Sequence, residues 1–172
     1  MDVVTLAKRF VNSCGINWPV REIFRTEKAQ EAVYDPKRKE FRVNTEKIFL
    51  QANLLEMPME DYLVLVLCHK IGQYLDPDYE EAARNIHKMF RFLQEFAGIE
   101  SELLEAVMQR EQRAENFGEQ FVPARLLAAY HNVEQKNLCL AKQRTEIEII
   151  EFKQKCRRMA VSDADKEYYG ME

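Results

Sequence analysis

The stretch DYLVLVLCHKIGQYLDP, residues 61–77, decides the fold of this 172-residue chain. Six apolar residues in a row, 63–68, leave no polar face, which is typical of a helix buried on all sides. A short strand could carry the same run, but apolar residues continue at Ile71, Tyr74 and Leu75 on one helical face. We therefore predict a buried central helix that ends before Pro77, because proline cannot continue a helix.

Two polar residues in this stretch, His69 and Gln73, lie four positions apart and share one face of the predicted helix. This layout is the frame of the H-E-x-x-H zinc-peptidase motif, in which two histidines bind zinc and the glutamate is the general base. Here Lys70 takes the place of the glutamate, and Gln73 takes the place of the second histidine. Glu111 and Glu115, again four apart, are candidates for a third ligand on a later helix.

The composition is that of an ordinary globular protein and favours helices. The chain is 47% hydrophobic and 31% charged, and only five glycines and five prolines argue against turn-rich β structure. A net charge of −4 gives no reason to expect general nucleic-acid affinity. Four widely spaced cysteines and a start without a signal-peptide pattern predict reduced thiols and a cytoplasmic location. We expect no membrane segment, since no apolar run approaches the roughly 20 residues that span a bilayer.

Periodicity predicts a mainly helical α+β domain over residues 1–160, followed by a polar tail at 161–172. Alternating residues on either side of DPKRK predict a β-hairpin over 31–44, and 21–24 is a further candidate strand, so we expect a small, mainly antiparallel sheet. The other predicted helices are 3–13, 45–55, 78–97, 101–117, 119–130 and 133–160, with breaks near Gly118 and at Pro123.

The chain resembles the ImmA/IrrE-type metallopeptidases in three segments that follow one another in the order of that family. CHKIGQYL resembles the family's H-E-L-G-H helix, with Gly72 at its glycine. EQRAENFGEQFVP, 111–123, resembles the later E-x-x-A-(D/N/S)-x-F-A segment, and LLAAYHNV, 126–133, resembles the helix after it. The resemblance covers residues 1–140. It implies a zincin-like fold, zinc in the active relatives, and helix-turn-helix repressors of phages or mobile elements as partners.

Carried over position by position, the resemblance assigns His69 and Glu111 to zinc ligands. An amide oxygen at Gln73 is a much poorer zinc ligand than imidazole. An ammonium at Lys70 has no lone pair with which to take a proton from water. We therefore expect an inactive pseudopeptidase without metal or cofactor that acts by binding, in which His69, Lys70, Gln73, Glu111 and Glu115 are remnants of the site. The alternative is an active zinc endopeptidase that cleaves a repressor with an unusual ligand set, completed by His87 or His131.

Two further points stay open in the sequence. Lys70 either fills the space of the zinc and faces Glu111, with His69 and Gln73 completing a cluster, or extends to solvent. The apolar residues between 126 and 152 predict either a helix laid across the domain or a face for a partner or a second copy, through the C-terminal helix. A DNA-binding helix-turn-helix over 126–142, with its turn near Asn132, is a further alternative, although direct nucleic-acid binding is not expected.

Overall fold

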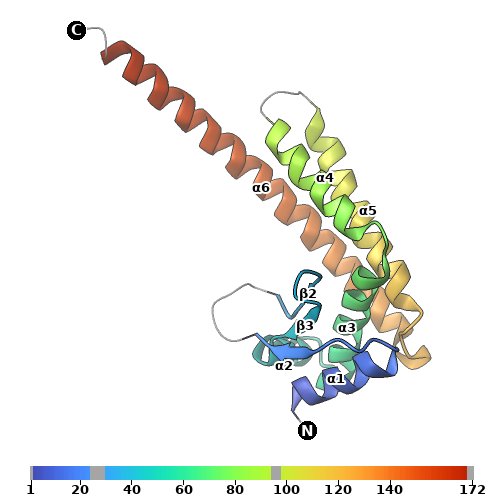
Figure 1. The fold of residues 1–172 in the computed structure, drawn as a ribbon. Coiled ribbons are helices and arrows are strands. Elements are labelled where there is room, and N and C mark those ends of the chain that lie inside the picture. Colours follow the sequence, from blue (N-terminus) through green and yellow to red (C-terminus); the bar gives the residue numbers. More distant parts are fainter. Residues whose placement is uncertain (1, 24–29, 94–97, 170–172) are drawn as a thin grey trace. The chain divides into compact units, whose positions relative to one another are not determined.

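A computed structural model describes residues 2–23, 30–93 and 98–169, except for the side chains of 157 and 159–169. Over these residues the chain is mainly helical, with one three-stranded sheet (Figure 1). In chain order the elements are α1 (Val3–Ser13), β1 (Val20–Glu22), β2 (Ala32–Asp35), β3 (Glu40–Val43), α2 (Thr45–Leu54), α3 (Met59–Leu75), α4 (Tyr79–Phe92), α5 (Ile99–Glu119), the 3-10 helix η1 (Ala124–Leu126) and α6 (Leu127–Tyr169).

The chain divides into two compact units. The first comprises residues 1–79 and 112–135, and the second comprises 80–111 and 136–172. Helices α5 and α6 each contribute residues to both units. The expectation of a single domain over residues 1–160 stays a prediction.

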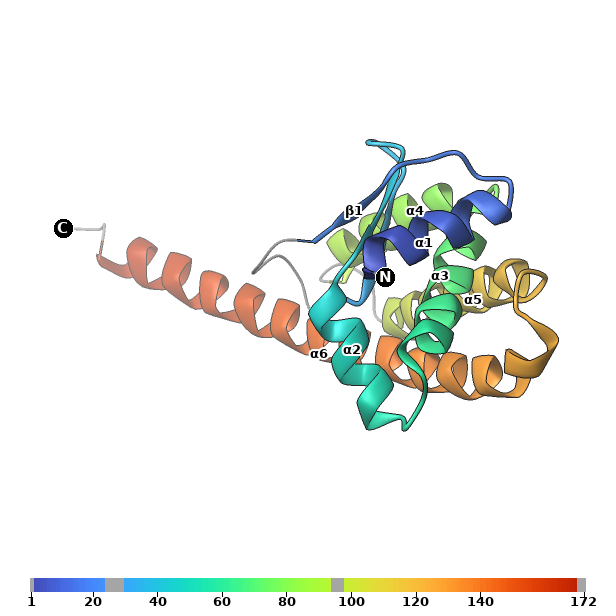
Figure 2. The same cartoon turned by 90° about the horizontal axis from the view of Figure 1, so that it is seen from below.

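Helix α3 lies at the centre of the first unit. Leu65, Leu67, Cys68 and Ile71 on this helix are fully buried, and the helix packs against α1, α2 and β2 (Figures 1 and 2). The uninterrupted apolar run places α3 at the centre because it puts apolar side chains on every side of the helix, and neighbouring elements bury or partly bury them. The predicted central helix is confirmed, and it ends at Leu75, just before the Asp-Pro pair.

Local capping sets the start of the neighbouring helices. The side chain of Asp2 accepts a hydrogen bond of 2.8 Å from the Thr5 amide at the start of α1. Gly15, at φ +79°, ends that helix in the left-handed conformation that glycine adopts without strain. Asn44 caps α2 by accepting from the Lys47 amide at 3.1 Å. The predicted helices over 3–13 and 45–55 are confirmed, because both signals are local in sequence.

The sheet has the strand order β1-β3-β2. β2 and β3 form the predicted hairpin and pair antiparallel, whereas β1 pairs with the other side of β3 in parallel. The sheet is therefore mixed, and the expectation of a mainly antiparallel sheet is wrong. Residue alternation identifies a strand but carries no information about its direction, and a parallel neighbour requires only a longer connection. The candidate strand over 21–24 corresponds to β1, which covers residues 20–22. Position 24 lies outside the described residues.

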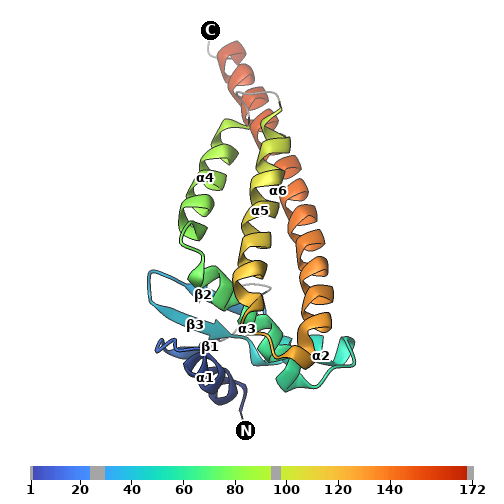
Figure 3. The same ribbon diagram turned by 90° about the vertical axis from the view of Figure 1, so that its right-hand side faces the viewer.

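The second unit has its own apolar core, formed by Ile86, Leu93, Leu103, Val107 and Ile149. Helices α4 and α5 run side by side and antiparallel in this unit (Figure 3). The helix predicted over 78–97 is described as far as Phe92, and residues 94–97 lie outside the described part. The predicted interruption near Gly118 and Pro123 is confirmed, because α5 ends at Glu119 and Pro123 precedes η1.

Helix α6 is longer than the range 133–160 that periodicity predicted. It begins at Leu127 and continues to Tyr169, into the predicted polar tail. The sequence contains neither glycine nor proline between 127 and 169, so no residue interrupts the helix. The predicted turn near Asn132 is therefore wrong, and the helix-turn-helix interpretation of 126–142 fails with it. No helix in the described ranges is both long and apolar enough to cross a membrane.

Replacing Leu65 by alanine is expected to lower the free energy of unfolding by about 2–5 kcal/mol, because the side chain is fully buried in α3. Leu54→Ala on α2 is the matched control, since Leu54 is 67% exposed and its truncation leaves no cavity. Urea denaturation followed by circular dichroism measures both variants. Equal losses in the two would contradict the central position of α3.

Candidate functional site

The candidate site lies where α3 and α5 cross in the first unit, and this crossing brings their backbones into contact. A Cβ atom placed on Gly72 of α3 would lie 1.8 Å from the carbonyl oxygen of Ala114 on α5. A Cβ atom on Gly118 of α5 would lie 2.3 Å from the carbonyl oxygen of Cys68 on α3. Only glycine fits at either position, so these two glycines permit the close approach of the helices.

His69 is buried beside this crossing, and each of its two ring nitrogens lies close to a polar atom of another side chain. Its Nε2 lies 2.9 Å from the side-chain nitrogen of Gln73, one turn further along α3. Its Nδ1 lies 2.7 Å from the Oε2 atom of Glu134 on α6. With the amide oriented in this way its nitrogen donates, so Nε2 accepts and the ring proton lies on Nδ1, facing the carboxylate.

Glu134 is the residue of this group that the sequence prediction missed. Its side chain is 2% exposed, which makes it one of the most deeply buried carboxylates of the described residues. A buried carboxylate requires a partner, and His69 provides it. The sequence does contain a sign that Glu134 is buried. Glu134 follows Leu126 and Tyr130 at four-residue spacing, so its charge lies on an otherwise apolar helix face.

Glu115 organises a second polar group at the same crossing. Its Oε2 accepts a hydrogen bond of 2.6 Å from the side chain of Gln112, and its Oε1 lies 3.4 Å from Nδ1 of His131. Its backbone carbonyl accepts a 3.1 Å hydrogen bond from the hydroxyl of Tyr130. Burial, together with the nearby Glu134, raises the pKa of the Tyr130 phenol well above its usual range.

The thiol of Cys68 is no candidate nucleophile. Its side chain is fully buried in α3, and burial raises the pKa of the thiol far above its usual range. A nucleophilic cysteine instead requires a lowered pKa and access to substrate. The role of Cys68 is therefore packing at the helix crossing.

The end of α3 is fixed to α5 by a charged pair. Asp76 is buried and accepts a hydrogen bond of 3.1 Å from the Nε atom of Arg113, which also contacts Asp78 at 3.2 Å. The Asp76 carboxylate raises the pKa of the Arg113 guanidinium further above its usual value. This pair holds the last turn of α3 beside the segment that carries Ala114 and Glu115.

Glu111 and Lys70 fall in different units. Glu111 belongs to the second unit, where its Oε1 accepts a hydrogen bond of 2.6 Å from the guanidinium of Arg110. Lys70 is partly exposed on α3 in the first unit. The predicted contact between the Lys70 ammonium and the Glu111 carboxylate stays a prediction, as does the assignment of Glu111 to a ligand position.

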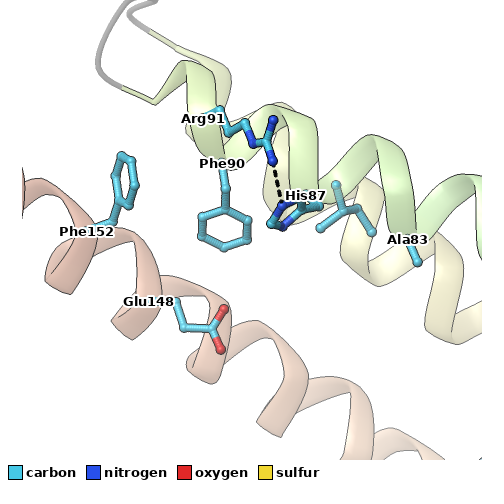
Figure 4. Close-up of a pocket in the computed structure, with 7 residues that line it drawn as sticks. Ala83, His87, Phe90, Arg91, Glu148 and Phe152 are labelled. Carbon is cyan, nitrogen blue, oxygen red and sulfur yellow. Dashed lines mark hydrogen bonds between the residues drawn. The ribbon is translucent and has the colours of Figure 1, made fainter.

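The other two histidines have local partners. His131 in the first unit contacts Glu115, and its Nε2 lies 3.9 Å from Glu119. His87 in the second unit lies 3.4 Å from the Arg91 guanidinium and lines an open pocket of about 460 Å³ between α4 and α6. Figure 4 shows His87, Phe90 and Arg91 on one wall and Glu148 and Phe152 on the other. The predicted use of His87 or His131 to complete a ligand set with His69 stays a prediction.

Comparison of the chain with protein-family models, with curated proteins and with solved structures gives no match. In the parts of the chain that the structure describes, no group of three or more histidine, cysteine, aspartate or glutamate side chains is arranged to hold a metal ion. The site is thus defined by its own geometry. It is a buried histidine held between an amide and a carboxylate, beside a crossing of two helices in backbone contact.

Gly72→Ala is expected to destabilise the protein by about 3 kcal/mol, because the new methyl group would overlap the Ala114 carbonyl oxygen. The sign is informative, since the same exchange in an ordinary helix stabilises it by about 1 kcal/mol. Gly15→Ala is the control that separates steric overlap from backbone strain. A Cβ atom at Gly15 would meet no other atom, so this variant should lose only the roughly 1 kcal/mol that an alanine costs at a positive φ. A stable Gly72→Ala variant in thermal and urea denaturation would show that the helices are further apart.

Glu134→Ala is expected to lower the free energy of unfolding by about 3 kcal/mol, because it removes one partner of a buried pair and leaves Nδ1 of His69 without its carboxylate. Glu148→Ala on the same helix is the control, since Glu148 is exposed and should change stability by less than about 0.5 kcal/mol. Long-range ¹⁵N correlation spectra of the histidine rings provide a second measurement. Protonated Nε2 in His69 of the native protein would contradict the arrangement described.

Proposed function

We propose that this protein acts by binding rather than by catalysis, as an inactive relative of the ImmA/IrrE-type metallopeptidases working in the cytoplasm. The observation that carries this proposal is the contact between Nε2 of His69 and the amide nitrogen of Gln73 at 2.9 Å. The nitrogen that a zinc ion would use in such a site is already accepting a hydrogen bond from the chain's own side chain.

The other ring nitrogen adds support. Metal-binding histidines usually donate their second N–H to a carboxylate or carbonyl, which fixes the orientation of the ring. His69 faces Glu134 in this manner. This is the orientation that a ligand histidine would have, and under the proposal Gln73 takes the place of the metal's second imidazole and Lys70 that of the general base.

The helix crossing supports the resemblance to the family. Gly72, Ala114 and Gly118 belong to the two segments on which the resemblance rests, and they are also the residues at which α3 and α5 touch. The zincin-like fold is part of the proposal. An architecture that keeps such a contact without a base can still present a surface to a protein, and we propose a helix-turn-helix repressor of a phage or mobile element as the partner.

The metal content tests the proposal. Native protein purified without chelators is expected to contain far less than one equivalent of zinc. When the native protein and the double variant Lys70→Glu/Gln73→His are each dialysed against zinc, the double variant is expected to bind more of it. His69→Ala added to that double variant is the control and should lose the gain. Near one equivalent of tightly held zinc in the native protein would favour the active peptidase instead, and no uptake by the double variant would count against the resemblance.

Incubation with a repressor tests the partner. A purified helix-turn-helix repressor of a phage is the probe, and isothermal titration calorimetry together with gel electrophoresis follows binding and cleavage in one sample. Binding without cleavage is the expected result. Cleavage that stops when zinc is chelated would contradict an inactive protein, and no binding at high protein concentration would contradict the proposed partner.

A further inference from the structure

The outer face of α6 in the second unit carries an apolar stripe that the proposed function does not use. Leu138 and Ile149 of this helix point inward and are buried, whereas Leu140, Ile147 and Ile150 are 45%, 54% and 54% exposed. The spacing of the exposed residues, seven and then three positions, is that of the a and d positions of a coiled-coil seam. Gln143 and Gln154 occupy the remaining positions of the stripe.

Charged residues flank the stripe on both sides. With Ile147 at position a, Arg144 and Glu151 fall at the e positions, and Glu146 and Lys153 fall at the g positions. Each side therefore carries one positive and one negative charge, seven residues apart. Such flanking charges decide which helix a seam accepts and in which direction.

We propose that this face of α6 binds a second copy of the chain, with the two helices antiparallel and Ile147 of one copy beside Ile150 of the other. In an antiparallel pair, e positions face e positions and g positions face g positions. The register that joins the isoleucines places Arg144 opposite Glu151 of the second copy. It also places Glu146 opposite Lys153 of the second copy, whose ammonium contacts Glu100 of its own chain as well. Two-fold symmetry repeats each of these pairs.

The same charges disfavour the other ways of pairing the stripe. In a parallel pair, the g position faces the following e position, so Glu146 would face Glu151 of the second copy. In antiparallel registers displaced by one heptad, either Arg144 or Glu151 would face its own counterpart. Only the proposed register has opposite charges on both sides of the apolar contact, which is why the pattern selects a second copy in one orientation.

The interface is small, because among the described side chains each copy contributes three large apolar ones. We therefore expect a reversible dimer with a Kd on the order of 100 µM, well above that of a standard-size interface. Sedimentation equilibrium of the full chain from about 10 µM to about 1 mM covers this range. A protein that stays monomeric throughout would overturn the proposal.

Charge exchange provides the test of orientation. Arg144→Glu and Glu151→Arg are each expected to raise the Kd roughly tenfold, because each places like charges opposite one another twice in the dimer. The two changes combined restore opposite charges and are expected to return the Kd to its native value. Both side chains are exposed, so the variants should fold, and circular dichroism checks this.

Two variants distinguish this seam from general association through apolar surface. Ile147→Glu is expected to abolish the dimer, whereas Leu54→Glu, at a leucine on α2 that is 67% exposed against 54% for Ile147, is expected to leave it unchanged. Tighter association of Glu151→Arg alone would indicate a parallel pair and overturn the proposed orientation. Failure of the double charge exchange to restore association would overturn the proposed register, and loss of the dimer in Leu54→Glu would place the interface elsewhere.

Discussion

The contact between the backbones of α3 and α5 is the constraint on which the first unit depends. Gly72 and Gly118 leave no space for a methyl group against the facing carbonyl oxygens. Side chains normally keep helix axes 8–10 Å apart, and here two glycines and one alanine remove that spacing. The same approach places Asp76, at the end of α3, within 3.1 Å of the Nε atom of Arg113 on α5.

The cluster itself has opposing energetic consequences. Burying the carboxylate of Glu134 costs free energy that its contact with His69 offsets, and the pair adds little stability compared with an apolar pair of the same size. The pair joins α3 to α6, because the Nδ1 atom of His69 and the Oε2 atom of Glu134 lie 2.7 Å apart. The amide of Gln73 completes this arrangement by occupying the second ring nitrogen. The buried group is thus held together by its own side chains.

Local signals were sufficient to predict much of this fold, and distant pairings were not. The central helix, the caps of α1 and α2 and the β2–β3 hairpin depend on residues within a few positions of one another. The direction of β1 depends on its pairing with β3, about twenty residues away, and residue alternation does not indicate whether that pairing is parallel or antiparallel. The candidate site behaves likewise. The contact of His69 with Gln73 follows from helical spacing, whereas Glu134 meets His69 from a different helix, and helical periodicity cannot anticipate that meeting.

The burial of Cys68 has a practical consequence for the motions of the protein. Its thiol is shielded by the helix crossing and kept protonated, while Cys139 on α6 is open to solvent. A thiol reagent should therefore modify Cys139 immediately and reach Cys68 only during transient openings of the native state. When the partly exposed Cys14 and Cys156 are replaced by serine, the slow phase of alkylation reports the rate at which α3 opens.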